Sequence, residues 1–210
     1  MTANGDAIRG LCAYNIDPRR DKATLERVKA ALQAKAGHAE TKPRDREEAR
    51  RCIEAITLFE RHENVLGLRG MPLEECPRLD PVIIEGVAVS IRPHFLVRAA
   101  DGRVGAGIIR VAKTPDPDDC KLDATRERRG DERRELNRYT VAMLQMLLEA
   151  QGGAFGTPSR DLCFVADIRL GERIDAAADH TVRIRALRGA CSQIARHWPL
   201  ITPRNSVLNK

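Results

Sequence analysis

The chain has 210 residues, of which 42% are apolar and 31% are charged, enough for one sizeable core and an appended element. Its aromatic content of 3% argues against recognition of nucleic acid by base stacking on broad aromatic surfaces. The formal charge of +6 and a pI near 9.2 are compatible with a nucleic acid partner, and equally with an ordinary basic protein.

The cysteines are widely scattered and form no C-x-x-C pair, so the sequence indicates neither a zinc site nor a thioredoxin motif. We expect buried, reduced thiols. No apolar run approaches the roughly 18 residues of a membrane span, and the polar start lacks the charged and apolar regions of a signal peptide. We therefore expect a cytoplasmic protein that does not enter a membrane.

The first part of the chain is predicted to be helical. Residues 23–36 carry leucine, valine and alanine at helical spacing, and a second amphipathic helix follows Pro43 and runs to about His62. Residues 64–81 are rich in glycine and proline and predict an irregular connection. We expect residues 1–80 to form an N-terminal helical pair that packs on a core formed by residues 81–210, in one domain overall.

Residues 82–113 have the pattern of three strands. Alternating apolar residues from 87 to 91 predict a half-buried strand, and Pro93 predicts a bend after it. Asp101 and Gly102 suit a type I′ hairpin turn between a strand at 95–97 and another at 104–111. We expect a mostly antiparallel meander here, followed by a charged and mobile loop at 113–133.

The last third of the chain alternates helix and strand. Residues 134–150 predict a strong helix that ends at Gly152 and Gly153. Residues 162–170 form an apolar strand suited to the centre of a sheet, and residues 172–177 can pair beside it. A final helix is expected at 182–198, with one apolar stripe. The predicted fold class is α+β, or mixed α/β, with a central mixed sheet flanked by helices.

This order of elements, with the phrase from Gly86 to His94 and the later Gly107-Ile-Ile-Arg110, resembles the PD-(D/E)XK nuclease superfamily, and within it the RecB-like group. The resemblance covers residues 80–200 and implies a restriction-endonuclease-like fold. In that family an Asp on the second strand, and a Glu two residues before a Lys on the third, meet at one metal site. The carboxylates hold a divalent cation, and the lysine helps position or activate the attacking water.

All three positions are changed in this chain: His94 stands for the Asp, Ile108 for the Glu and Arg110 for the Lys. Imidazole suits transition metals and is a poor replacement where magnesium prefers oxygen, and Ile108 cannot bind a metal at all. Arg110 can hold a phosphate through two hydrogen bonds but stays protonated, so it cannot act as a general base. These residues favour an anion over a cation.

RecB-like nucleases also carry Gln-x-x-x-Tyr on the helix after the third strand. Glu135 and Tyr139 stand at the matching place, one helical turn apart on one face. The resemblance makes them candidate catalytic residues together with His94 and Arg110. The alternative is a surface glutamate beside a core tyrosine.

A relocated metal site is a further hypothesis, with Glu85, His94 and Asp167 as its ligands. Asp167 lies on an apolar strand, where a carboxylate needs a partner or a function. Other motifs are absent or misplaced. Gly102, Gly105 and Gly107 lie within a strand and no helix follows, so they indicate close backbone packing or a bulge rather than a dinucleotide site.

The last 30 residues carry six Lys and Arg and no Asp or Glu, so they account for a charge of +6, equal to that of the whole chain. Arg185, Arg188 and Arg196 share one stripe of the final helix, separate from its apolar stripe. This stripe is a candidate phosphate track. The alternative is a solvated face whose arginines pair with acids elsewhere in the fold.

The sequence therefore favours a catalytically degenerate PD-(D/E)XK-like protein that binds nucleic acid through the basic final helix. No cofactor is expected on this interpretation. One alternative is an active nuclease with rearranged ligands, which would require Mg²⁺ or Mn²⁺. Another is a regulatory module whose amphipathic N-terminal helices bind a protein partner without nucleic acid.

Overall fold

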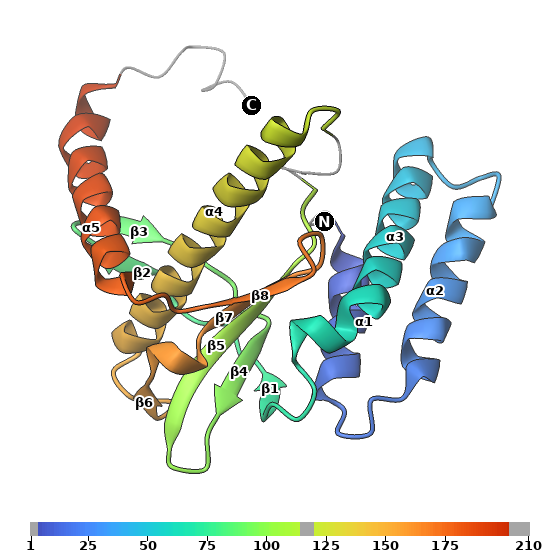
Figure 1. Ribbon diagram of the computed structural model, residues 1–210, viewed down its shortest axis with the longest axis horizontal. Helices are drawn as coiled ribbons and strands as arrows, with labels where there is room; N and C mark the ends of the chain where they lie inside the picture. The colour runs from blue at the N-terminus through green and yellow to red at the C-terminus, as the bar shows by residue number, and fades with distance from the viewer. Residues whose placement is uncertain (1–3, 114–119, 202–210) are drawn as a thin grey trace.

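Two groups of helices enclose a mixed β-sheet in the computed structural model, which describes residues 4–113 and 120–201 (Figure 1). The helices of the described ranges are α1 (Gly5–Ile16), α2 (Lys22–Gly37), α3 (Pro43–Leu66), α4 (Asp123–Ala150) and α5 (His180–His197), with short 3₁₀ turns η1 (Arg160–Leu162) and η2 (Trp198–Leu200). The strands are β1 (Leu73–Glu75), β2 (Val82–Ile84), β3 (Val87–Val89), β4 (Phe95–Arg98), β5 (Arg103–Arg110), β6 (Thr157–Pro158), β7 (Phe164–Asp167) and β8 (Glu172–Asp175).

The central sheet has the strand order β1-β4-β5-β7-β8, with β6 paired to the start of β5. The β5–β7 pair is parallel, while β1–β4, β4–β5 and β7–β8 are antiparallel. The α+β class with a mixed central sheet is thus confirmed. Residues 162–170 supply β7 next to the centre, and β8 pairs beside it, as the apolar pattern predicted.

Helices cover both faces of the sheet. Alternate residues of each strand point to opposite faces, so each face carries apolar side chains that a helical layer buries. Phe95 and Val97 of β4 join the core that α1, α2 and α3 complete, while Leu96 between them joins the core built with α4. Helix α5 lies outside α4 and packs on α4 and on the β2–β3 hairpin (Figure 1). None of the described helices is long and apolar enough to cross a membrane.

The N-terminal layer contains three helices where the sequence predicted a pair. Helix α1 was missed because Gly5 and Gly10 weaken its helical pattern, although Ala7, Leu11 and Tyr14 bury one face at helical spacing. Gly10 has a packing role, since a Cβ at this position would lie 3.1 Å from the side chain of Val28 on α2. The irregular connection predicted at 64–81 also contains a strand, β1.

The charged segment at 113–133 was predicted as a loop, but it is helical from Asp123 onward. Helix α4 thus begins eleven residues earlier than expected. Its alternating charges form ion pairs along the helix, among them Arg126–Asp123 and Arg128–Glu132. Such pairs at spacings of three and four stabilise exposed helix. Residues 114–119 of the predicted loop lie outside the described residues.

The first strand of the predicted meander is a separate two-stranded hairpin, β2–β3, rather than part of the central sheet. Its two-residue turn is Glu85–Gly86, and both residues have positive φ, 47° and 81°, as a type I′ turn requires. The type I′ turn predicted at Asp101–Gly102 was wrong, because only Gly102 has positive φ there. The β4–β5 hairpin instead closes through a turn from Ala99 to Gly102.

Two glycines of β5 allow the neighbouring segment η1–β7 to approach closely, which confirms close backbone packing at this glycine-rich strand. A Cβ at Gly105 would lie 2.1 Å from the carbonyl oxygen of Leu162, and one at Gly107 would lie 2.3 Å from the Phe164 ring. Both contacts are too short for a real side chain. The parallel pairing of β5 with β7 therefore depends on these glycines.

We predict that Gly105→Ala lowers the free energy of unfolding by about 3 kcal/mol, because the backbone of Leu162 cannot move away without breaking the β5–β7 pairing. Urea denaturation followed by circular dichroism measures this change. Gly189→Ala is the matched control: nothing lies within 4 Å of a Cβ at this exposed position of α5, so it should stabilise by up to about 1 kcal/mol. Equal effects of the two substitutions would contradict the prediction.

Candidate functional site

A polar cluster lies where the parallel strands β5 and β7 end. Arg110 is the last residue of β5, Asp167 is the last residue of β7, and the two are direct partners in the strand register. Arg133 and Asn137, one turn apart on α4, complete the cluster from the adjacent face. The carboxyl ends of parallel strands are a frequent place for binding sites in α/β folds, which makes these four residues a candidate site.

Asp167 is fully buried, and both of its carboxylate oxygens accept hydrogen bonds. Oδ2 accepts from Arg133 Nε at 2.6 Å and from Asn137 Nδ2 at 2.8 Å. Oδ1 accepts from Arg133 Nη2 at 2.9 Å and from the backbone N–H groups of Arg169 and Leu170 at 3.0 and 3.2 Å. These bonds occupy the lone pairs that a metal ion would need.

Arg133 is also fully buried, with 0% of its surface exposed. Besides its two bonds to Asp167, it donates to the carbonyl oxygen of Ala112 at 2.7 Å and to that of Lys113 at 3.2 Å. Both carbonyls belong to the segment that leaves β5. The guanidinium therefore joins α4, β7 and the exit of β5 at one point, and its charge compensates the charge of Asp167.

Arg110 adds a second positive charge to the cluster. Its Nη1 donates to Asn137 Oδ1 at 2.6 Å, and its Nε lies 4.0 Å from Asp167 Oδ2. Burial and then the charge of Arg133 lower the pKa of Arg110, and the charge of Asp167 partly offsets both effects. The guanidinium groups of Arg110 and Arg133 thus both lie beside the Asp167 carboxylate.

His94 lies immediately before β4 and is tied to the backbone of β5. Its N–H donates to the carbonyl oxygen of Gly107 at 2.8 Å, and its ring Nδ1 accepts the N–H of Ile109 at 3.0 Å. Burial lowers the pKa of His94 to about 4. The neutral ring thus carries its proton on Nε2, and its one lone pair is already used, so in this conformation it does not fit a metal ion.

Glu135 and Tyr139 face α5 instead of this cluster. Both oxygens of Glu135 accept hydrogen bonds from Arg183 of α5, at 3.0 and 2.7 Å, and these bonds are the main reason that the pKa of Glu135 is lowered. The Arg183 guanidinium also lies 5.9 Å from the centre of the Tyr139 ring, within the range of a cation–π contact. The Glu-x-x-x-Tyr pair therefore joins α4 to α5.

The ligands of the hypothetical relocated metal site lie on different elements. Glu85 is exposed in the turn of the β2–β3 hairpin, Asp167 is enclosed at the end of β7, and His94 precedes β4. Within residues 4–113 and 120–201, no three His, Cys, Asp or Glu side chains are grouped so that they could hold a metal ion. Ile108 is half-buried and packs against the core under α4. The residues at the family's metal-site positions do not fit a divalent cation.

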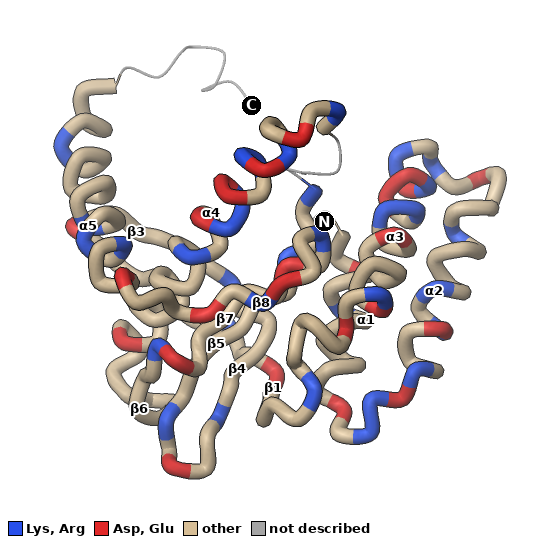
Figure 2. Tube along the Cα trace, in the orientation of Figure 1, with Lys and Arg blue, Asp and Glu red and all other residues tan. Residues whose placement is uncertain are grey.

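The basic stripe of α5 is exposed and separate from the buried cluster. Arg185, Arg188 and Arg196 are all exposed, and none of them forms an ion pair or side-chain hydrogen bond with another described residue. Arg183, two residues before the stripe, is buried and paired with Glu135 and Asp179. Glu135 and Asp179 are thus engaged by Arg183, whereas Glu85 and Glu149 line a hollow beside Arg188 without an ion pair to it. The helix itself contains no Asp or Glu, and its basic residues are blue in Figure 2.

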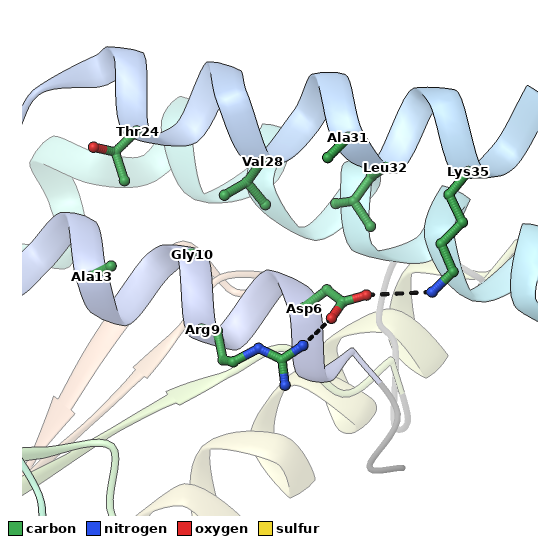
Figure 3. A pocket seen from close by; sticks show the side chains of 9 residues that line it. All are labelled: Asp6, Arg9, Gly10, Ala13, Thr24, Val28, Ala31, Leu32 and Lys35. Carbon is green, nitrogen blue, oxygen red and sulfur yellow. Dashed lines mark hydrogen bonds and ion pairs between the residues drawn. The ribbon is translucent and has the colours of Figure 1, made fainter.

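A hollow of about 460 Å³ lies between α1 and α2, on the other side of the sheet (Figure 3). Small apolar side chains such as Ala13, Val28 and Ala31 line it. Its one carboxylate, Asp6, is already paired with Arg9 and with Lys35. The hollow therefore adds no candidate catalytic group.

Sequence reasoning missed Arg133 and Asn137, the two α4 residues of the buried cluster. Arg133 fell in the segment predicted as a loop, and its partner Asp167 is 34 residues away along the chain. The usable signal was the spacing of four between an arginine and an asparagine, next to an apolar strand that contains one Asp.

Comparison with known proteins finds no matching family model, no matching curated protein and no matching solved structure. The fold and the candidate sites define the protein only as a mixed α+β protein. It has a buried Arg–Asp cluster at the carboxyl ends of two parallel strands and a separate basic helix.

We predict that Arg133→Met lowers the free energy of unfolding by about 3–5 kcal/mol, because it leaves the Asp167 carboxylate buried without its charged partner. Adding Asp167→Asn to this variant should restore part of the loss by removing the uncompensated charge. Arg134→Met is the control, since its partner Glu172 is partly exposed and such pairs contribute about 1 kcal/mol or less. The prediction is wrong if urea denaturation gives similar losses for positions 133 and 134.

We predict that His94 makes the protein sensitive to mild acid. Its pKa is about 4 in the folded protein and near the usual value of 6.5 in the unfolded chain, so below pH 6.5 the unfolded chain binds more protons. Its contribution to stability is complete above pH 6.5 and is lost as the pH falls towards 4, by an amount of the order of 2–3 kcal/mol.

Thermal denaturation of the wild type and of His94→Gln between pH 4 and 7 tests this expectation. The glutamine oxygen can still accept the Ile109 N–H but does not titrate, so the stability of the variant should fall less over this range. His180, whose pKa burial also lowers, is present in both proteins and cancels in the comparison. Parallel pH profiles would contradict the assignment.

Proposed function

We propose that this protein binds nucleic acid through phosphate contacts made by Arg185, Arg188 and Arg196 of α5. We also propose that its nuclease-like frame, which resembles the PD-(D/E)XK superfamily, is catalytically degenerate. The observation that carries the binding proposal is the exposure of these three arginines on one stripe without an acidic partner among the described residues. Unpaired guanidinium groups in a row suit the repeating charge of a phosphate backbone.

The charge distribution along the chain supports this assignment. Residues 180–201 contain no Asp or Glu, and the neighbouring acids Glu135 and Asp179 are bound to the buried Arg183. The alternative of a solvated face neutralised by other parts of the fold loses support, because no such pairs are formed within the described ranges. Arginine stripes of this kind attract a polyanion from solution and fix its path.

The degenerate character is supported by the residues at the family's metal-site positions. Ile108 offers no ligand atom, and His94 uses its lone pair on the Ile109 N–H. Arg110 donates to Asn137 and cannot act as a base. The nearby carboxylate of Asp167 is already filled by hydrogen bonds. These side chains hold the fold together and leave none of the carboxylate ligands that metal-dependent hydrolysis requires.

We predict that changing Arg185, Arg188 and Arg196 together to Gln weakens binding to DNA and RNA oligonucleotides regardless of sequence. The loss should be largest at low salt, and the slope of log K against log salt should fall by about 2 to 3, one counterion for each lost phosphate contact. Fluorescence anisotropy of labelled oligonucleotides over a series of salt concentrations measures both effects.

The control variant changes Arg44, Arg46 and Arg61 of α3 to Gln, which removes the same charge from the other side of the sheet. It should bind almost as well as the wild type. Equal weakening by the two triple variants, or no weakening by the α5 variant, would overturn the assignment to α5. Chelator-sensitive cleavage of the same oligonucleotides in Mg²⁺ or Mn²⁺ would overturn the degenerate part of the proposal.

A further inference from the structure

The apolar stripe of α5 extends beyond the part of the helix that is covered. Ile184, Leu187 and Cys191 pack against α4 and the β2–β3 hairpin. One and two turns further on, Ile194 is 46% exposed and Trp198 is 70% exposed. Leu200 and Ile201, which follow at the end of η2, are more than half exposed as well. Such a group of large apolar side chains at the surface is usually a contact site.

These side chains border a hollow of about 370 Å³ between the turn of the hairpin and the end of α5. Gly86 and Val87 of the hairpin form one wall, and Ile194, Trp198 and Pro199 form the other. The hollow is lined by apolar residues, and Trp198 is the one aromatic side chain among them. The volume is in the range of small-molecule sites.

Two arginines of α5 lie near this apolar hollow. Ala195, which also lines it, lies seven residues after Arg188 on the same ridge of α5, so the two positions are about 10 Å apart along the helix axis. Arg188 itself lines a second hollow on the strand side of the same hairpin, next to Glu85. Arg196 follows Ala195 directly. A ligand that combines flat apolar faces with a run of negative charges matches this surface.

We propose that the hollow receives an unpaired nucleobase stacked on Trp198, so that the protein prefers single-stranded to double-stranded nucleic acid. The inference rests on the proposed function, because the arginine stripe supplies the backbone contacts. In a duplex the base faces are stacked on one another and are inaccessible, whereas a single strand can turn a base outward onto an aromatic ring. The low aromatic content of the chain leaves one tryptophan, and it stands beside the basic stripe.

The test uses the fluorescence of this single tryptophan, which reports on its own surroundings. Titration with a single-stranded oligonucleotide should quench the emission, while the duplex of the same sequence should quench it much less. Trp198→Ala should weaken single-strand binding roughly five- to a hundredfold and leave duplex binding unchanged. Trp198→Phe should retain most of the affinity, because it keeps an aromatic face.

Leu122→Ala, which removes another exposed apolar side chain far along the chain from α5, is the matched control and should bind like the wild type. If the α5 arginine variant weakens binding while Trp198→Ala does not, or if single strand and duplex quench alike, base stacking is refuted and phosphate binding stands. If the wild type binds no oligonucleotide, the proposed function itself fails. A change in emission with protein concentration alone, together with a dimer in sedimentation, would assign the hollow to a second copy of the chain and refute the inference.

Discussion

The ion pair between Arg133 and Asp167 is the constraint on which the arrangement of the central elements depends. Both side chains are fully buried, and removing two charges from water costs more than their attraction returns unless their remaining donors and acceptors are also bonded. Here they are bonded to Asn137, to two carbonyl groups after β5 and to two N–H groups after β7. These bonds hold the long helix α4 against the ends of these strands.

The same bonds explain why the carboxyl end of the sheet does not offer metal ligands. A carboxylate in this position is useful to a metal site only when its oxygens are open, and Asp167 has its oxygens filled by donors that also set the fold. The Arg133 guanidinium takes the place that a metal cation would occupy, because its positive charge already balances the charge of Asp167. His94 follows the same principle, because its ring nitrogen replaces a strand partner for the N–H of Ile109. Asp167 and His94, which the sequence suggested as site residues, thus use their polar atoms to hold parts of the fold together.

Local patterns in the sequence were sufficient for the helices α2, α3 and α5 and for strands β5, β7 and β8, because each has a clear period or an apolar run. They failed where tertiary contacts decide. Helix α1 contains two glycines, of which Gly10 is explained by its packing on α2. The start of α4 has too little apolar character to be recognised. The type I′ turn was predicted at Asp101–Gly102 from a favourable residue pair, whereas the structure forms it at Glu85–Gly86. The Arg133–Asp167 pair could not be predicted from local patterns, because its two residues are 34 positions apart in the sequence.

Two sets of arginines differ in how their charge is balanced. Arg133, Arg134 and Arg183 each meet carboxylates with good geometry and join elements of the fold, so their charges are already compensated. The stripe on α5 follows directly after the compensated Arg183, and no acid remains nearby on the helix to balance it. The positive charge of Arg185, Arg188 and Arg196 therefore stays at the surface of α5, without an ion pair to another described residue. Charge that the fold leaves unbalanced is available to a partner, and the apolar end of the same helix adds a second kind of contact that a simple counterion could not use.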